Sequence, residues 1–267
     1  MESHEIKIGL TLEPCMQKNH STSESNSWSL CPEGPELAED EVHVWRADLE
    51  CDARVLRRLE ATLSTDERAR ANRFLFQPDR NHFIATRGIL RELLGRYVNR
   101  APEHLEFDYA PQGKPTLHTE LPHTSVRFNV SHSHGMALLA FTVGRQVGVD
   151  LELVRKFGGQ EIAARFFSPQ EVMELSCLPQ WVQDEGFFLC WTRKEAYVKA
   201  RGEGLNIPLK SFHVTLTPGK PECLHATDDS NWTLGSLRPD PRYVGALVAE
   251  ARGCKLRQWN WRSADEP

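Results

Sequence analysis

Two acidic residues lie two positions apart in the stretch Gly-Val-Asp-Leu-Glu at 148–152. The alternating residues around it predict a β-strand, on which the side chains of Asp150 and Glu152 point to the same side. Neighbouring carboxylates repel each other unless a cation, a proton or solvent relieves them. A hard cation such as Mg²⁺ would suit this oxygen-only pair. The alternative is an acidic pair on the solvent face of an amphipathic strand.

A second group of polar residues occupies the sequence Trp-Thr-Arg-Lys-Glu-Ala-Tyr-Val-Lys at 191–199. The spacing predicts a helix on which Trp191, Glu195 and Lys199 follow one another at i, i+4 and i+8 on one side. Taken singly, Glu195 and Lys199 could form a surface ion pair, and Trp191 could belong to the core. Together, an acid, two lysines and a large aromatic residue on one helix suit a site for a polyphosphate and a metal ion.

The order of these two motifs resembles the signature of the 4′-phosphopantetheinyl transferase superfamily. That signature is a strand of the Ile-Gly-Ile-Asp-Ile-Glu type, then about forty residues, then Trp-x-x-Lys-Glu-Ala, and both parts stand here at that spacing. Further matches cover about residues 63–216 in the family's order. They are Arg73-Phe74 followed by Asp79, Gln-Gly-Lys-Pro at 112–115, Asn-Val-Ser-His-Ser at 129–133 and Arg-Phe-Phe-Ser-Pro-Gln-Glu at 165–171. With two expected lobes, the chain is similar to the long, monomeric, surfactin-synthetase-activating branch.

This resemblance implies transfer of the 4′-phosphopantetheine group from coenzyme A to a serine of an apo carrier protein, with release of 3′,5′-ADP. It implies that Asp150, Glu152 and Glu195 bind Mg²⁺, for which Mn²⁺ can substitute. Glu195 is also the candidate general base towards the acceptor serine, directly or through a metal-bound water. Lys199 would contact the pyrophosphate and stabilise transition-state charge, whereas Lys194 would face the other way into a salt bridge. Acyl, peptidyl and polyketide carrier proteins all remain open as acceptors.

The resemblance also assigns residues to the phosphates of coenzyme A. Ser131 and His132 would reach phosphate oxygens, with the 3′-phosphate as the partner of His132. Alternatively, His132 and His134 could form a zinc pair, although no cysteine or third histidine lies nearby in the sequence. Lys114 would contact the adenylate end of coenzyme A, or it could be a solvated loop lysine.

Arginines follow the predicted helix at 79–98 in a stripe opposite its apolar face. Arg80, Arg87 and Arg91 lie at i, i+7 and i+11, and this pattern by itself predicts a solvated face. The resemblance instead makes Arg70, Arg73 and Arg87 candidates for the 3′-phosphate, since guanidinium groups bind phosphate through paired donors. Lysines are more usual before the Arg-Phe element of the family, which leaves the individual assignments open.

The predicted strands and helices that must position these residues occur in the same order in the first and the second half of the chain. A Ser-x-x-Glu capping box at 64–67 and a Ser-Pro-x-Glu start at 168–171 predict helix N-termini in the first and second half. The second half is expected to hold two helices, the later one ending near Gly202 and Gly204. The expected strands are 42–47, 105–109, 126–130, 136–143, 147–152, 212–216, 232–237, 243–250 and 256–261.

The repeated order predicts an α+β fold of two similar lobes related by pseudo-twofold symmetry, with the active site between them. The expected units are a flexible N-terminal extension at 1–40, an N-terminal lobe at 41–143 and a C-terminal lobe with the carboxylates at 144–262. The extension is expected to be loose because residues 20–27 are polar and low in complexity, although residues 6–10 could add an edge strand.

The composition excludes several classes of protein. The 267 residues carry a net charge of −5, which argues against a general nucleic-acid binder, and contain no apolar run long enough for a membrane span. Seven scattered cysteines without a Cys-x-x-Cys pair indicate reduced thiols in a cytoplasmic protein. A general phosphotransferase or hydrolase is disfavoured because the chain lacks a P-loop and a nucleophile elbow. The remaining alternative is a non-catalytic homologue that binds coenzyme A or a carrier protein, but such a homologue typically loses part of the metal set.

Overall fold

The structure is a computed structural model that describes residues 28–31, 36–118, 126–226, 231–250 and 253–263. In its N-terminal lobe a strand, three helices and four further strands follow one another. In chain order these are β2 (Glu41–Asp48), α1 (Ala53–Ala61), α2 (Thr65–Ala71), α3 (Gln77–Val98), β3 (Phe107–Tyr109), β4 (Pro115–Leu117), β5 (Val126–Ser133) and β6 (Met136–Val143), with a 3₁₀ turn (Pro102–His104) after α3.

The C-terminal lobe repeats this order. Its elements are β7 (Val147–Leu153), α4 (Gln160–Phe166), α5 (Pro169–Cys177), α6 (Gln180–Arg201), β8 (His213–Val214), β9 (Leu224–His225), β10 (Trp232–Leu237) and β11 (Tyr243–Glu250), with 3₁₀ turns (Gly204–Asn206 and Leu209–Ser211) after α6.

The two lobes share one sheet topology. In the N-terminal lobe β2 pairs with β6 and β6 with β5, and in the C-terminal lobe β7 pairs with β11 and β11 with β10, all antiparallel. In both lobes the first strand therefore pairs with the last, and a 22-residue helix, α3 or α6, precedes a small two-stranded sheet. This repetition confirms the predicted α+β fold of two similar lobes.

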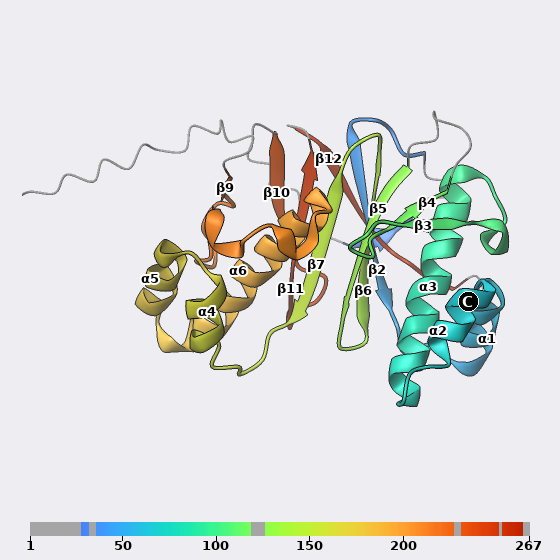
Figure 1. Cartoon of the computed structure of the whole chain (residues 1–267), viewed down its shortest axis with the longest axis horizontal. Helices are drawn as coiled ribbons and strands as arrows, with labels where there is room; N and C mark the ends of the chain where they lie inside the picture. Colours follow the sequence, from blue (N-terminus) through green and yellow to red (C-terminus); the bar gives the residue numbers. More distant parts are fainter. Residues whose placement is uncertain (1–27, 32–35, 119–125, 227–230, 251–252, 264–267) are drawn as a thin grey trace, which may run out of the picture.

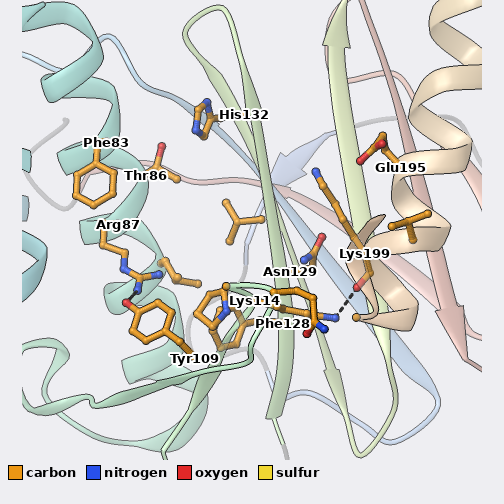
Figure 2. Close-up of a pocket in the computed structure, with 18 of the residues that line it drawn as sticks. Phe83, Thr86, Arg87, Tyr109, Lys114, Phe128, Asn129, His132, Glu195 and Lys199 are labelled. Atoms are coloured by element: carbon orange, nitrogen blue, oxygen red, sulfur yellow. Dashed lines mark hydrogen bonds between the residues drawn. The ribbon is translucent and has the colours of Figure 1, made fainter. Parts of the chain in front are cut away.

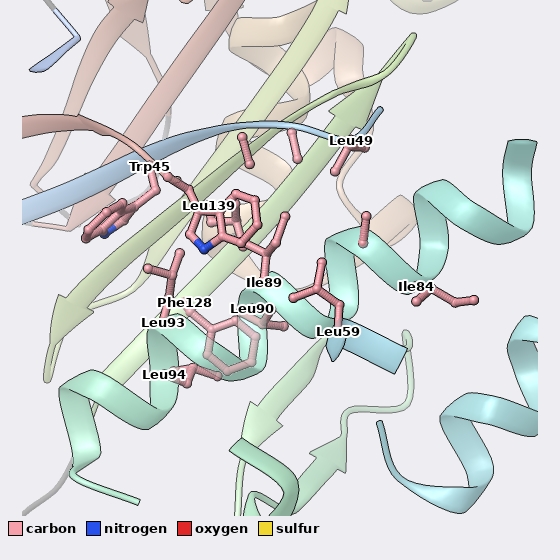
Figure 3. Packing of buried hydrophobic residues seen from close by; sticks show 14 of the residues in the cluster. Trp45, Leu49, Leu59, Ile84, Ile89, Leu90, Leu93, Leu94, Phe128 and Leu139 are labelled. Atoms are coloured by element: carbon pink, nitrogen blue, oxygen red, sulfur yellow. The ribbon is translucent and has the colours of Figure 1, made fainter. Parts of the chain in front are cut away.

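The molecule has four layers, with the sheets inside and the helices outside (Figure 1). In the N-terminal lobe, Leu59 of α1 and Ile89 of α3 pack against Trp45 and Leu139 of the sheet (Figure 3). A second core lies between the helices and sheet of the C-terminal lobe. A third core joins the lobes, because both sheets contribute their other apolar face to it; its residues include Val42, Val44, Leu138, Val147, Val149, Leu151 and Leu247.

The last strand crosses from one lobe to the other. β12 (Lys255–Asn260) follows the C-terminal lobe in sequence but pairs in parallel with β2 of the N-terminal lobe. β1 (Ser29–Leu30) pairs in turn with β12, and the indole nitrogen of Trp28 donates to the carbonyl of Arg238 at 3.0 Å. The expected loose extension is thus wrong for residues 28–30, which are paired with the core. The edge strand expected at residues 6–10 lies outside the described residues.

The helix boundaries follow the capping signals, with one difference. Ser64 and Ser168 both form complete capping boxes, and α6 ends at Gly202 in the left-handed conformation, as predicted. The structure has three helices between β7 and β8 where two were expected. Ser168 begins α5 separately from α4, and Pro179 ends it, because the residue before a proline is disfavoured in the helical conformation.

Lys194 faces away from the lobe interface into the C-terminal core. It is fully buried and forms an ion pair with Glu171 at 2.8 Å. Its ammonium also donates to the carbonyls of Leu209 and Phe212. The predicted salt bridge of Lys194 is confirmed, and it joins α5, α6 and the segment before β8.

Replacing Lys194 by methionine is expected to lower the free energy of unfolding by about 3–5 kcal/mol, because Glu171 would remain as a buried carboxylate without its cation. Urea denaturation measures this loss. Lys210→Met, at an exposed lysine of the same lobe, is the matched control and should change stability by less than about 0.5 kcal/mol. Equal losses in the two variants would contradict the structural role of Lys194.

Candidate active site

Two adjoining cavities lie between the lobes. The carboxylate cavity, of about 360 Å³, is lined by Asp150, Glu152, Trp191, Glu195 and Lys199, among others. The basic cavity, of about 450 Å³, lies between α3 and α6, with β5 across its floor (Figure 2). The two cavities share Val130, His132, Glu195 and Lys199. The motifs singled out from the sequence therefore meet where one cavity opens into the other.

The strand β7 presents both of its acids to the carboxylate cavity. Val149 and Leu151 point into the core between the sheets, so Asp150 and Glu152 lie on the opposite side of the strand, as the period of two predicts. Gly148 allows α6 to lie directly against this side, because a Cβ atom there would collide with the α6 backbone at Ala196 and Ala200. Sequence reasoning did not assign this role to Gly148, although the glycine is part of the motif.

The helix α6 carries the opposing residues. Trp191, Glu195 and Lys199 are partly exposed, whereas the intervening residues of the stretch from 191 to 200 are buried. The predicted i, i+4, i+8 arrangement is confirmed, and this stripe faces the cavity. The indole of Trp191 is stacked on Phe187, with ring centroids 6.1 Å apart, which fixes it at the cavity wall.

A hydrogen-bonded network holds one oxygen of Asp150. The Lys199 ammonium lies 2.6 Å from Asp150 Oδ1, to which the Ser131 hydroxyl also donates at 2.8 Å. The same ammonium donates to Ser131 Oγ at 3.1 Å. The other oxygen, Asp150 Oδ2, is buried and has no hydrogen-bond partner among the residues that the structure describes. A buried, unpartnered carboxylate oxygen is costly unless a cation or donor binds it.

The electrostatics of the three carboxylates favour a cation. Burial raises the pKa of Glu152, and the nearby charge of Asp150 raises it further. The pKa of Glu195 is raised by the same two causes in the same order. Among the described residues, no three acidic, histidine or cysteine side chains are close enough to hold one ion as they stand. The donor chemistry and the orphaned oxygen fit Mg²⁺, provided that the flexible glutamates turn towards it.

The basic cavity gathers most of the predicted phosphate ligands. Arg70, Arg87 and His132 line it, whereas Arg73 is exposed and is not among its lining residues. Arg87 bonds to Glu67 and to the Tyr109 hydroxyl. The side chain of His132 is exposed to solvent within the two cavities that it lines. Partial desolvation there, and then the charge of Lys199, lower the pKa of His132.

Lys114 has partners that the sequence could not indicate. Its ammonium donates to the backbone carbonyls of Lys199, at 2.6 Å, and of Val147, at 3.3 Å. The first of these bonds is drawn in Figure 2. Desolvation by burial lowers the pKa of Lys114 to about 8. It lines the basic cavity and also ties a turn of the N-terminal lobe to β7 and α6, so the alternative of a solvated loop lysine is wrong.

The prediction that the arginine stripe of α3 faces solvent is wrong for Arg91. Arg91 is 1% exposed, bonds to Glu67 at 2.6 Å and donates to the carbonyls of Pro102 and Leu105. These carbonyls belong to the segment after α3, which folds back over the helix. Arg80 is half-buried and paired with Glu60.

Comparison with known proteins identifies the chain. Residues 50–143 match the model of the N-terminal domain of 4′-phosphopantetheinyl transferases, and residues 146–248 match that of the 4′-phosphopantetheinyl transferase superfamily. The 4′-phosphopantetheinyl transferase HetI of Nostoc sp. is 40% identical over 237 residues, which cover 88% of this chain and 99% of HetI. The chain belongs to the 4′-phosphopantetheinyl transferase superfamily. This phosphopantetheinyl transferase is therefore an enzyme, as the sequence motifs implied.

Two further relatives of this phosphopantetheinyl transferase cover less of it. The 4′-phosphopantetheinyl transferase Sfp of Bacillus subtilis is 28% identical over 193 residues, 72% of this chain and 84% of Sfp. The L-aminoadipate-semialdehyde dehydrogenase-phosphopantetheinyl transferase of Homo sapiens is 29% identical over 167 residues, 59% of this chain and 54% of the human protein. The N-terminal-domain and superfamily models together match both lobes of this chain, in keeping with the predicted long branch. None of the helices in the described ranges has an apolar stretch that could cross a bilayer.

Proposed function

We propose that this phosphopantetheinyl transferase binds coenzyme A in the basic cavity and transfers its 4′-phosphopantetheine group, at the carboxylate cavity, to a serine of an apo carrier protein. The observation that carries this proposal is the unpartnered oxygen of Asp150 beside Lys199, where the two cavities meet. Both lobes of one chain complete the site, which supports a monomer as the active form.

The phosphates of coenzyme A would bind along the shared wall of the two cavities. Arg70, Arg87 and His132 supply donors in the basic cavity for the 3′-phosphate. Lys199 supplies a donor at the junction, where the pyrophosphate would lie, and Ser131 lines the same wall with its hydroxyl proton donated to Asp150. Arg73 has less support because it is outside the cavity lining.

The adenylate end of coenzyme A would lie towards Lys114 in this arrangement. Lys114 lines the basic cavity and keeps the C-terminal end of α6 against the N-terminal lobe. We propose that it shapes the adenylate end of the cavity from this position.

Asp150, Glu152 and Glu195 would hold Mg²⁺. When bound, the ion would neutralise the charge that develops on the leaving 3′,5′-ADP. The orphaned oxygen of Asp150 would provide the anchoring ligand, and a cation would relieve the burial and the repulsion that raise the pKa of both glutamates. An oxygen-only ligand set selects Mg²⁺ or Mn²⁺ over Zn²⁺.

The protein's own residues carry out the remaining steps. Glu195 would take the proton from the acceptor serine while the serine oxygen attacks the β-phosphorus of coenzyme A. The new bond joins the serine oxygen to phosphorus, and the bond to the bridging pyrophosphate oxygen breaks in line. Lys199 would stabilise the negative charge on the phosphoryl oxygens through this step. The Ser131 hydroxyl donates to the Asp150 carboxylate and accepts from the Lys199 ammonium, and so holds these two groups next to each other.

The test is a transfer assay with coenzyme A, Mg²⁺ and a panel of apo carrier proteins of the fatty-acid, polyketide and peptide-synthetase classes. Mass spectrometry should show addition of one phosphopantetheine group to at least one carrier, and excess EDTA should abolish it. A carrier whose acceptor serine is replaced by alanine is the control and should stay unmodified. Full transfer in excess chelator would contradict the metal site, and no transfer to any class would contradict the proposed acceptor.

A further inference from the structure

The strands β5 and β7 lie next to each other at the junction of the two lobes. In the part of the chain that the structure describes, β5 pairs with β6 and β7 pairs with β11, with no backbone ladder between β5 and β7. Each is an edge strand whose polar groups need partners. Asp150 and Glu152 therefore lie on a strand whose free edge is not held by a neighbouring backbone.

Side chains replace the missing ladder. Asn129 and Ser131 lie at alternate positions of β5 and face β7. The amide oxygen of Asn129 accepts from the backbone N–H of Val149 at 2.9 Å, and Ser131 donates to Asp150 at 2.8 Å. Both β5 residues are buried, so these bonds are shielded from water.

Ser133 is the third member of this series. Its hydroxyl donates to Glu152 Oε2 at 3.0 Å and lies 3.4 Å from the backbone N–H of Leu153, which donates to it. The residue is 8% exposed, whereas Glu152 reaches the cavity and is only partly buried. The serine is therefore fixed by the strand, and the carboxylate that it contacts has the freedom to turn.

We propose that Ser133 is a positioning residue that orients the Glu152 carboxylate for its metal, in the way that Ser131 orients Asp150. Adjacent members of one side-chain ladder on β5 then hold the two carboxylates of β7 in register across the lobe junction. This inference rests on the proposed magnesium site. Residues that hydrogen-bond to metal ligands typically contribute about 10–100-fold to metal affinity.

The experiment is a titration of coenzyme A-saturated protein with Mn²⁺, followed by the electron paramagnetic resonance signal of the free ion. Ser133→Ala is expected to weaken Mn²⁺ binding by about 10-fold. Ser133→Thr keeps the hydroxyl and should recover most of the affinity. Thr142→Val is the matched control, because it removes a buried hydroxyl of the neighbouring strand β6 that donates to the carbonyl of Arg145, just after the strand. It should leave the affinity unchanged while costing comparable stability.

A double-mutant cycle makes the test specific to the proposed partner. If Ser133 acts through Glu152, adding Ser133→Ala to Glu152→Gln should cause little further loss of Mn²⁺ affinity. Wild-type affinity in Ser133→Ala, with weakened binding in Glu152→Gln, would overturn the role of Ser133 and leave the metal site intact. Absence of Mn²⁺ binding in the unmodified, coenzyme A-saturated protein would overturn both the metal site and this inference. If Ser133→Ala does not fold, Ser133→Thr is used in its place. Because threonine keeps the hydroxyl, the Mn²⁺ affinity of this variant must then match that of the unmodified protein.

Discussion

Replacing Glu195 by glutamine is expected to lower kcat by about 10²–10⁴, and raising the Mg²⁺ concentration is not expected to restore it. Glutamine keeps the size of the side chain and one oxygen that can bind a metal, but it cannot accept the proton of the acceptor serine. Glu195 lines both cavities from α6, the position that a base between coenzyme A and the acceptor needs. Measuring kcat against Mg²⁺ concentration tests this expectation.

The pH dependence of kcat should report the same residue. Burial, and then the charge of Asp150, raise the pKa of Glu195, so its basic form is lost at a higher pH than that of an ordinary glutamate. Activity that requires the carboxylate should therefore fall at acid pH, and a bound cation, which favours the carboxylate form, should move this fall to lower pH. The acid limb of the profile should be absent from the residual activity of Glu195→Gln.

A matched control and an opposing outcome complete this test. Glu185→Gln changes a partly exposed glutamate on the same helix, paired with Arg238, and should keep both kcat and the pH profile. If Glu195→Gln instead retained appreciable activity that rose with Mg²⁺, Glu195 would be a metal ligand and not the base. A metal-bound water would then be the remaining candidate for the base.

The sequence predicted those features of the site that depend on local geometry. Period-two alternation was enough to place Asp150 and Glu152 on one side of a strand, and helical spacing was enough to align Glu195 with Lys199. The capping boxes at Ser64 and Ser168 were predicted equally well. Each of these depends on residues only a few positions apart, whose relative orientation is fixed by the backbone alone.

Features that depend on distant partners could not be predicted in this way. The helical pattern gave Arg91 the solvent-facing side of α3, because nothing in it shows that Glu67 and the segment after α3 would cover that side. The last strand was predicted as a strand, but its partner β2 lies some 200 residues earlier in the chain. Lys114 was placed on a turn, yet its partners are carbonyls of the other lobe. Such contacts form only once the two lobes pack together.

The glycine of the strand motif shows where a sequence signal existed without being used. Gly148 permits α6 to contact β7, and this contact sets the distance between the two carboxylates of the strand and Glu195 of the helix. Glycine inside a strand often marks a position where the backbone of another element approaches closely. The proposed metal site thus depends on a packing contact as much as on its ligands.

Replacing Asp150 by alanine is expected to lower activity more than about 100-fold at ordinary Mg²⁺, since even the partners of metal ligands contribute about 10–100-fold. The variant loses the orphaned oxygen, and it also leaves the Lys199 ammonium without its closest counterion, so the remaining positive charge would repel the metal. Because the defect is one of metal affinity, activity should recover partly as Mg²⁺ is raised, in contrast to Glu195→Gln. Asp184→Ala, at a partly buried aspartate of the same lobe that accepts from the backbone N–H of Phe157 outside both cavities, is the control and should keep normal metal dependence. Wild-type turnover of Asp150→Ala at low Mg²⁺ would show that Asp150 does not hold the metal, and the catalytic arrangement proposed for the two cavities would then be wrong.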